Sequence, residues 1–172
     1  MSISWPPMVR RGHAIAIADV QRFEQEIGAR LPEDYRRFLL EINGGRPAPT
    51  HRTFTMRRSD RIGAPIESTV DTLHSLDNPS GEGFDLRERQ LFRRGDYPDN
   101  SLRIGYDDPG RALVLILSGS HRGELWMLTL DDPPIEPSPG VGWFERRDVW
   151  HVANSFAEFM AGLGPLEDED NA

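Results

Sequence analysis

Four aspartates form the densest group of carboxylates in the chain outside its C-terminal tail: Asp96, Asp99, Asp107 and Asp108. A pair of carboxylates can perform general acid–base catalysis when burial separates their pKa values. The order Asp-Asp-Pro-Gly at 107–110 is equally typical of a tight turn, and exposed carboxylates can contact a basic partner. Because no nucleophile or metal ligand accompanies these aspartates in the sequence, a turn is favoured first, partner contact second and catalysis last.

The five histidines are the other candidate bases and metal ligands: His13, His51, His74, His121 and His151. None stands at the spacing of a zinc or iron motif, and the chain has no cysteine. Ser120 precedes His121, but the motif G-x-S-x-G is absent and the segment is typical of a hairpin turn. A phosphate-binding P-loop is excluded because the chain has no lysine. The sequence therefore predicts no catalytic residue, no bound metal and no cofactor, and a protein that is not an enzyme.

Aromatic side chains offer another way to act, because tryptophan and its neighbours dominate binding hot spots. Trp126 and Trp150 lie in stretches typical of strands, so we expect them in the core. Trp143 and Phe144 follow the stretch 132–142, which contains four prolines and two glycines and reads as an exposed loop. We therefore predict that Trp143 and Phe144 contact a partner.

The charge balance favours a basic protein as that partner. The 172-residue chain has a formal net charge of −8, and four of those charges lie in the tail 167–170, so the remainder carries −4. This balance argues against nucleic acid, whose binding domains are net basic. All 20 basic residues are arginine, which suits carboxylate recognition but is also the pattern of a GC-rich genome. Their spread along the chain favours the second explanation.

The sequence predicts a single soluble domain in the cytoplasm. Its length fits one domain with a proper core, and the absence of cysteine is compatible with a reducing compartment. The longest aliphatic run, 112–117, is six residues, whereas a membrane helix needs about 20. The N-terminal residues lack the continuous apolar stretch of a secretory signal. Neither a membrane nor nucleic acid is expected as a partner.

Two helices are predicted to position the rest of the chain. Asp19 can cap a first helix that ends at Gly28. A second helix begins at Pro32, whose φ suits a first turn, and ends at Asn43-Gly44-Gly45, which suits the left-handed conformation. Its apolar stripe is Tyr35, Phe38, Leu39 and Ile42. Two helices joined so closely are expected to pack one shared apolar face against a sheet.

Six stretches have the pattern of strands: 53–56, 66–73, 102–104, 112–117, 124–130 and 149–152. The stretches 102–104, 112–117 and 124–130 predict an antiparallel meander. A turn is expected at 78–83 and a short helix over 85–94. Ser155 and Glu158 have the spacing of a capping box, which predicts a final helix that buries Phe156 and Phe159 and ends at 164–165.

These landmarks together resemble the SUKH superfamily, which groups Smi- and Knr-type fungal cell-wall regulators with bacterial immunity proteins. The first part of the resemblance is an amphipathic helix followed by Leu31-Pro32 with Tyr35, Phe38 and Leu39, and then by Asn43-Gly44-Gly45. The second part is the segment Ile104-Gly105-Tyr106-Asp107 with Gly110, followed by a hairpin at Gly123. The last part is Ser155-Phe156 with Phe159 and Leu163. It implies a single α+β domain with a mostly antiparallel mixed sheet backed by helices. The expected boundaries are an irregular N-terminal lead at 1–18, the domain at 19–164 and a disordered acidic tail at 165–172.

The resemblance also implies a function by binding. Bacterial members resemble antidotes to toxins, so the expected role is a non-enzymatic immunity protein that blocks the active surface of a cognate toxin, for which a basic nuclease would fit the charge. The alternative is an adaptor or regulatory scaffold that binds cell-envelope or signalling proteins. The residues expected to contact the partner are Asp96, Asp99, Asp107, Asp108, Trp143 and Phe144.

Overall fold

A computed structural model describes residues 3–58, 63–77, 85–91, 97–129, 142–146 and 148–166. Asp96, the expected turn at 78–83, most of the proline-rich stretch and the acidic residues of the tail lie outside these ranges. Within them, the chain forms helices and antiparallel strands in one domain, so the predicted α+β class is confirmed.

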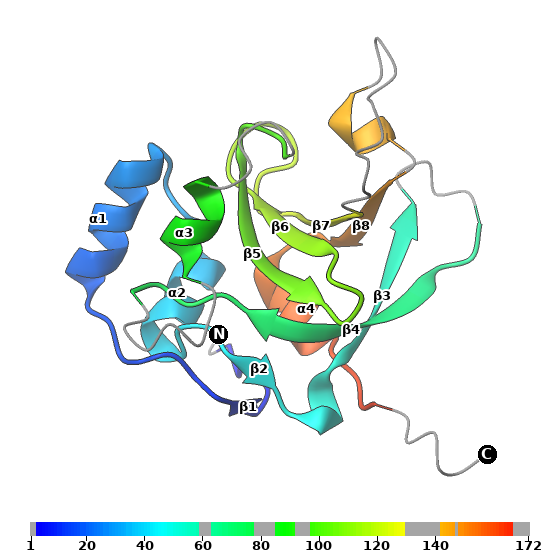
Figure 1. Ribbon diagram of the computed structural model, residues 1–172, viewed down its shortest axis with the longest axis horizontal. Coiled ribbons are helices and arrows are strands. Elements are labelled where there is room, and N and C mark those ends of the chain that lie inside the picture. The colour runs from blue at the N-terminus through cyan, green and yellow to red at the C-terminus, as the bar shows by residue number, and fades with distance from the viewer. Residues whose placement is uncertain are drawn as a thin grey trace.

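Six strands form one closed antiparallel sheet (Figure 1). In sheet order they are β3 (Thr53–Arg58), β4 (Ile66–Leu73), β5 (Ser101–Asp107), β6 (Ala112–Ile116), β7 (Leu125–Leu128) and β8 (Val149–Ala153). Consecutive strands pair throughout, and β8 returns to β3 with Arg57 opposite His151 and Arg58 opposite Trp150. This last pairing joins segments more than 90 residues apart in sequence and closes the sheet.

Strand β6 explains why the sheet has two apolar faces. All five of its residues are buried, as its unbroken aliphatic sequence predicts. Since side chains alternate along a strand, Leu113 and Leu115 face the main core. Ala112, Val114 and Ile116 point to the other side and form a second cluster with Trp126, which we call the second apolar face. One face of the sheet thus contributes to the main core, and the other contributes to the second cluster.

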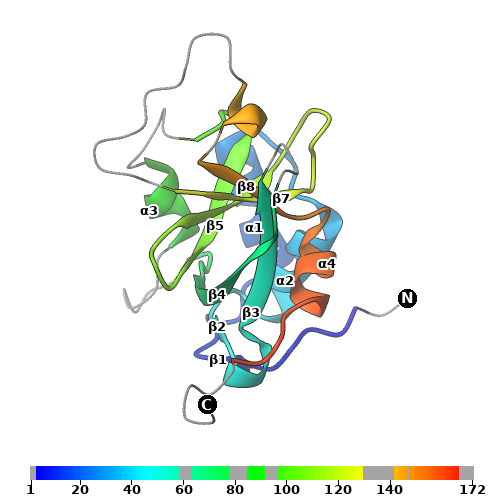
Figure 2. The same cartoon turned by 90° about the vertical axis from the view of Figure 1, so that its right-hand side faces the viewer.

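Helices cover the main core. They are α1 (Ile17–Ile27), α2 (Glu33–Glu41), α3 (Leu86–Leu91) and α4 (Phe156–Ala161). Figure 1 shows α3 between α1 and β5, and Figure 2 shows α2 and α4 next to each other on one side of the sheet. Phe38 of α2 and Phe156 of α4 are fully buried, with ring centroids 4.8 Å apart. The expected helix pair therefore packs on the sheet with the C-terminal helix as a third partner.

The N-terminal lead, expected to be irregular, contributes to this core. Met8–Val9 forms the short strand β1, which pairs with β2 (Arg46–Pro47). The Trp5 ring lies edge-on to Phe38, with centroids 5.5 Å apart. Only tertiary contacts order this segment, because its prolines give it no regular periodicity of its own.

The N-cap of helix α1 lies three residues before the expected cap, Asp19. Its N-cap is Ala16, and Asp19 occupies the third helical position, where its carboxylate accepts a hydrogen bond of 2.8 Å from the Ala16 N–H. The aspartate therefore stabilises the helix start from inside the first turn, where its charge also complements the helix dipole.

Asn43 connects three parts of the fold. It adopts φ +58° after α2, as the closing motif predicts, but its side chain is also buried. The amide donates to the carbonyls of His13 and Leu76, each at 2.9 Å, and accepts from the Leu76 N–H at 2.8 Å. At the next position, a Cβ on Gly44 would lie 2.7 Å from the His74 backbone, so a glycine is required there.

Candidate functional site

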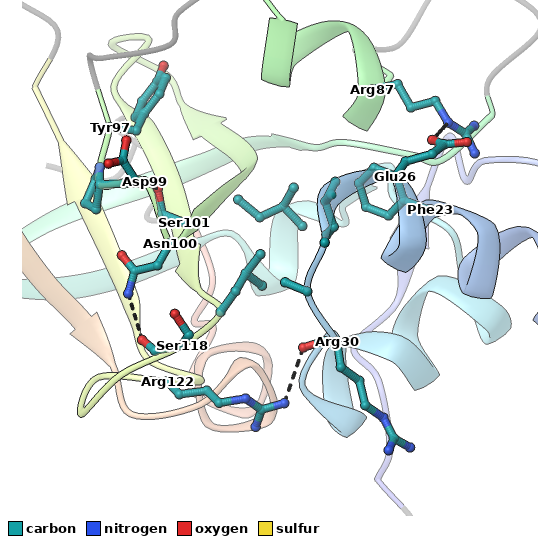
Figure 3. A pocket seen from close by; sticks show the side chains of 16 residues that line it. Phe23, Glu26, Arg30, Arg87, Tyr97, Asp99, Asn100, Ser101, Ser118 and Arg122 are labelled. Carbon is teal, nitrogen blue, oxygen red and sulfur yellow. Dashed lines mark hydrogen bonds and ion pairs between the residues drawn. The ribbon is translucent and has the colours of Figure 1, made fainter.

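A groove of about 970 Å³ lies between the end of α1, α3 and the start of β5 (Figure 3). Its floor is apolar, with Phe23 and Leu102 buried at 1% exposure and Leu117 at 7%. Its rim is polar and carries charges of both signs. This volume is at the upper end of the range of about 300–1,000 Å³ for ligand pockets.

Local backbone geometry forms one wall of the groove. Gly28 has φ +67° and ends α1, so that Ala29 and Arg30 turn away from the helix axis. The N–H of Leu31 donates to the Glu24 carboxylate at 2.9 Å, which fixes the link into α2. Across the groove, the Arg122 guanidinium donates to the Arg30 carbonyl at 3.3 Å, and Asn100 donates to the Ser118 carbonyl at 2.7 Å.

The three arginines that line the groove have different environments. Arg87 is committed to the fold: it pairs with Glu26 at 2.6 Å and with Asp77, and lies over the Phe23 ring. By contrast, Arg30 and Arg122 are exposed, and within the described ranges neither guanidinium meets a carboxylate. The exposed carboxylate of Asp99 likewise has no partner there.

A cluster of rings, which we call the aromatic cluster, lies on the second apolar face: His121, Trp126, Phe144 and His151. The Phe144 centroid is 4.2 Å from that of His121 and 4.8 Å from that of Trp126. The Glu124 carboxylate ties the cluster together, since it lies 2.9 Å from His121 Nδ1 and accepts from Trp126 Nε1 at 3.0 Å. Its oxygen is 4.0 Å from His151 Nε2.

The β6–β7 hairpin joins the groove to the aromatic cluster. His121 packs on Phe144, whereas the next residue, Arg122, reaches across the groove to Arg30. Tyr97 is also shared, because it lines the groove and packs against the second apolar face. The two features therefore form one continuous surface.

The predicted site residues fall at different places. Asp107 is 0% exposed and accepts hydrogen bonds from Ser68 at 2.9 Å and from the Arg111 side chain and N–H at 2.6 and 2.7 Å. Gly110 follows in the left-handed region with φ +87°. Asp107 therefore holds the β5–β6 turn, in agreement with the turn interpretation, and its oxygens face the protein interior.

Asp108 and Asp99 are both exposed but lie at opposite ends of β5. The seven residues of this strand place them about 20 Å apart. Asp108 pairs with Arg52 at 3.0 Å and with Thr69, whereas Asp99 lines the groove. The fold thus does not gather the aspartates into one catalytic group, and Asp96 lies outside the described residues.

The predicted aromatic contacts are half-buried. Trp143 and Phe144 lie in the short 3₁₀ helix η2 (Trp143–Glu145) and pack against the second apolar face. The Arg146 guanidinium lies 4.4 Å from the Trp143 ring centroid, a cation–π contact. As predicted for core residues, Trp126 is 5% exposed and Trp150 packs against the main core.

A polar cluster on β4 and β5 gave no signal in the sequence. Burial alone would raise the pKa of Asp71, but hydrogen bonds from Tyr106 and Thr72, with the Arg46 and Arg52 guanidiniums, lower the pKa of this carboxyl below its usual value. These groups tie β2 and the start of β3 to the sheet. The cluster is therefore structural.

The groove residues Arg30 and Arg122 were also missed, because no local motif marks two arginines 92 residues apart. The part of the chain that the structure describes places no three His, Asp or Glu side chains where they could hold a metal ion. In that same part, no helix has the length and apolarity needed to cross a bilayer.

Comparison with known proteins supplies the family. No curated protein matches the sequence. A model of the SMI1 / KNR4 family (SUKH-1) matches residues 14–162, which include every helix of the fold and all six strands of the closed sheet. The chain therefore belongs to the SMI1 / KNR4 family, SUKH-1.

Proposed function

We propose that this protein is an immunity protein that binds a cognate bacterial toxin in the cytoplasm and blocks its active surface without catalysing a reaction. Its membership of the SUKH-1 family, over most of its length, carries the proposal. The family groups immunity and regulatory proteins that act by binding. A rigid body with an exposed docking surface is sufficient for that role.

The net charge of −8 supports a basic toxin, of which a nuclease is the class that fits best. Opposite net charges raise the rate of encounter, and this gain decreases as salt screens the charges. A toxin of this kind must be neutralised before it reaches its substrate, so a fast encounter is an advantage.

Trp143 and Phe144 are the proposed anchors of the interface, together with the exposed carboxylates of Asp99 and Asp108. Because both rings are already half-buried on the second apolar face, little side-chain freedom remains to be lost on binding. Asp96 stays a proposed contact from its sequence alone. Asp107 would act indirectly, by fixing the turn that presents Asp108. An interface of ordinary size would bury about 1,600 Å² in total.

Co-expression with the toxin encoded beside this gene tests the proposal. Cells that produce the toxin alone should stop growing, and production of this protein should restore growth through a complex that survives size-exclusion chromatography. The Trp143→Ala variant should weaken binding about tenfold or more, whereas Ile17→Ala, at an exposed site on α1, should bind like the wild type. Cell death while both proteins remain soluble would contradict the proposed function.

A further inference from the structure

We propose that the groove between α1, α3 and the start of β5 receives an extended segment of the toxin that presents an acidic side chain next to an apolar one. This inference rests on the proposed function and assigns part of its interface to a defined place. The groove is distinct from the proposed anchors Trp143 and Phe144, although residues of the β6–β7 hairpin contact both places.

The acidic side chain is inferred from Arg30 and Arg122. Figure 3 shows the Arg122 guanidinium at one end of the groove, where it bridges to the carbonyl of Arg30, while the Arg30 side chain points away from Arg122. Two exposed guanidiniums in this position, neither paired with a carboxylate in the described chain, stabilise the fold little. Each guanidinium is a planar donor that suits bidentate recognition of a partner's carboxylate.

The apolar side chain is inferred from the floor of the groove. Ile27 and Ala29, which are partly exposed in the lining, lie over the buried side chains of the floor and form a surface onto which an aliphatic or aromatic side chain can pack. Asp99 lies on another side of the groove from Arg30 and Arg122, as Figure 3 shows, and its carboxylate, which has no partner among the described residues, can accept from a donor further along the same segment. This separation of charges favours an extended chain in one direction over a compact ligand.

The groove is pre-formed, which lowers the cost of binding. Arg87 fixes the α3 wall to α1 through Glu26, and Glu24 fixes the turn after α1 through the Leu31 N–H. Because these contacts exist in the free protein, a partner would not have to order the walls. Arg30, Arg122 and Asp99 are exposed at the rim, where a partner can reach them, and none of them forms an ion pair within the described residues.

Continuity with the proposed anchors supports the toxin as the occupant. A segment that lies in the groove passes Arg122, and the adjacent residue His121 contacts Phe144 of the aromatic cluster. One partner can therefore cover both features.

Charge reversal at the rim tests the inference with a catalytically inactive form of the adjacent toxin as the probe. We expect Arg30→Glu and Arg122→Glu each to weaken binding at least about tenfold, and the double variant to weaken it further. Arg11→Glu, which reverses an exposed arginine on the segment before α1, is the matched control and should bind like the wild type. Circular dichroism and unfolding midpoints verify that the variants fold.

A charge swap identifies the pairing directly. Acidic residues of the toxin are changed to arginine one at a time, and one such change should restore the binding of Arg30→Glu or Arg122→Glu. If the wild type binds and all groove variants bind equally well, the groove inference is wrong although the proposed function stands. If the wild type does not bind the toxin, both are wrong.

Discussion

The burial of the Phe38 side chain could be predicted from its position in the sequence. Its place in the apolar stripe of α2 predicted burial, and the ring is 0% exposed between Trp5, Tyr35 and Phe156. Neighbouring aromatic rings in edge-on or tilted arrangements contribute beyond the area that they bury. Removal of this ring leaves a cavity that rigid neighbours on three sides cannot fill.

The Phe38→Ala substitution should lower the free energy of unfolding by about 3 to 5 kcal/mol. The change is measured by urea denaturation, with Ile17→Ala as a control at a site that is 57% exposed. The control should change stability by less than about 0.5 kcal/mol. A loss below about 1 kcal/mol for Phe38→Ala would mean that the core relaxes around the missing ring.

Asp71 makes stability depend on pH. Its pKa is lowered in the folded protein by the hydrogen bonds and arginines around it, which outweigh burial. A carboxyl with a lowered folded pKa contributes stability that is complete above its unfolded pKa of about 3.9 and is lost as pH decreases through the folded pKa. The stabilising contribution of Asp71 should therefore disappear in the acid range below about pH 4.

The Asp71→Asn variant tests this dependence. Its unfolding midpoint should lie below that of the wild type at neutral pH, and the difference should shrink as the pH falls below about 4. Glu67→Gln, at an exposed position on the same strand, is the control for loss of one negative charge. A difference between wild type and Asp71→Asn that is constant with pH would contradict the assignment.

At the scale of elements, α4 has two caps of different origin. The sequence predicted the local one, and Ser155 Oγ indeed accepts from the Glu158 N–H at 3.1 Å. The second comes from α2: the Asp34 carboxylate accepts from the Ala157 N–H at 2.8 Å. Asp34 thereby stabilises α4 across a sequence separation of 123 residues.

Removal of either cap should destabilise the protein. We expect Ser155→Ala and Asp34→Ala each to lower the free energy of unfolding by about 0.5 to 2 kcal/mol. Asp34→Asn keeps an acceptor oxygen and should retain part of the stability, which separates hydrogen bonding from charge. Chemical denaturation of the four proteins measures the differences, and an unchanged Asp34→Ala variant would show that the contact with α4 is unimportant.

At the scale of the whole molecule, closure of the sheet links the ends of the domain. Strand β3 pairs with β4 on one side and with β8 on the other, and the helices pack on a core that all six strands share. Since β8 precedes α4, and α4 packs against α2, the closed sheet and these two helices share one core. We therefore expect one cooperative unit.

Unfolding in urea should follow a single transition. The transition followed by tryptophan fluorescence, which reports on Trp5, partly buried against the main core, and on Trp126 on the second apolar face, should coincide with that followed by far-ultraviolet circular dichroism. Two separate transitions would show that the second apolar face unfolds independently of the helices, and would contradict a single domain.

The sequence by itself determined the elements that local rules control. These elements are the apolar stripe from Tyr35 to Ile42, the left-handed residue Asn43 that ends α2, strand β6 and the Ser155 cap. Each of them depends on residues that lie close together in the sequence. The same local order was sufficient to indicate the family that the match over residues 14–162 shows.

Only the tertiary structure decided what depends on residues far apart. Closure of β3 on β8, the packing of Trp5, the second cap from Asp34 and the meeting of Arg30 with Arg122 each join segments separated by more than 30 residues. It also separated Asp107, which is buried in a turn, from the exposed Asp99 in the groove. Periodicity and capping report on neighbours along the chain, whereas a binding surface is formed by neighbours in space.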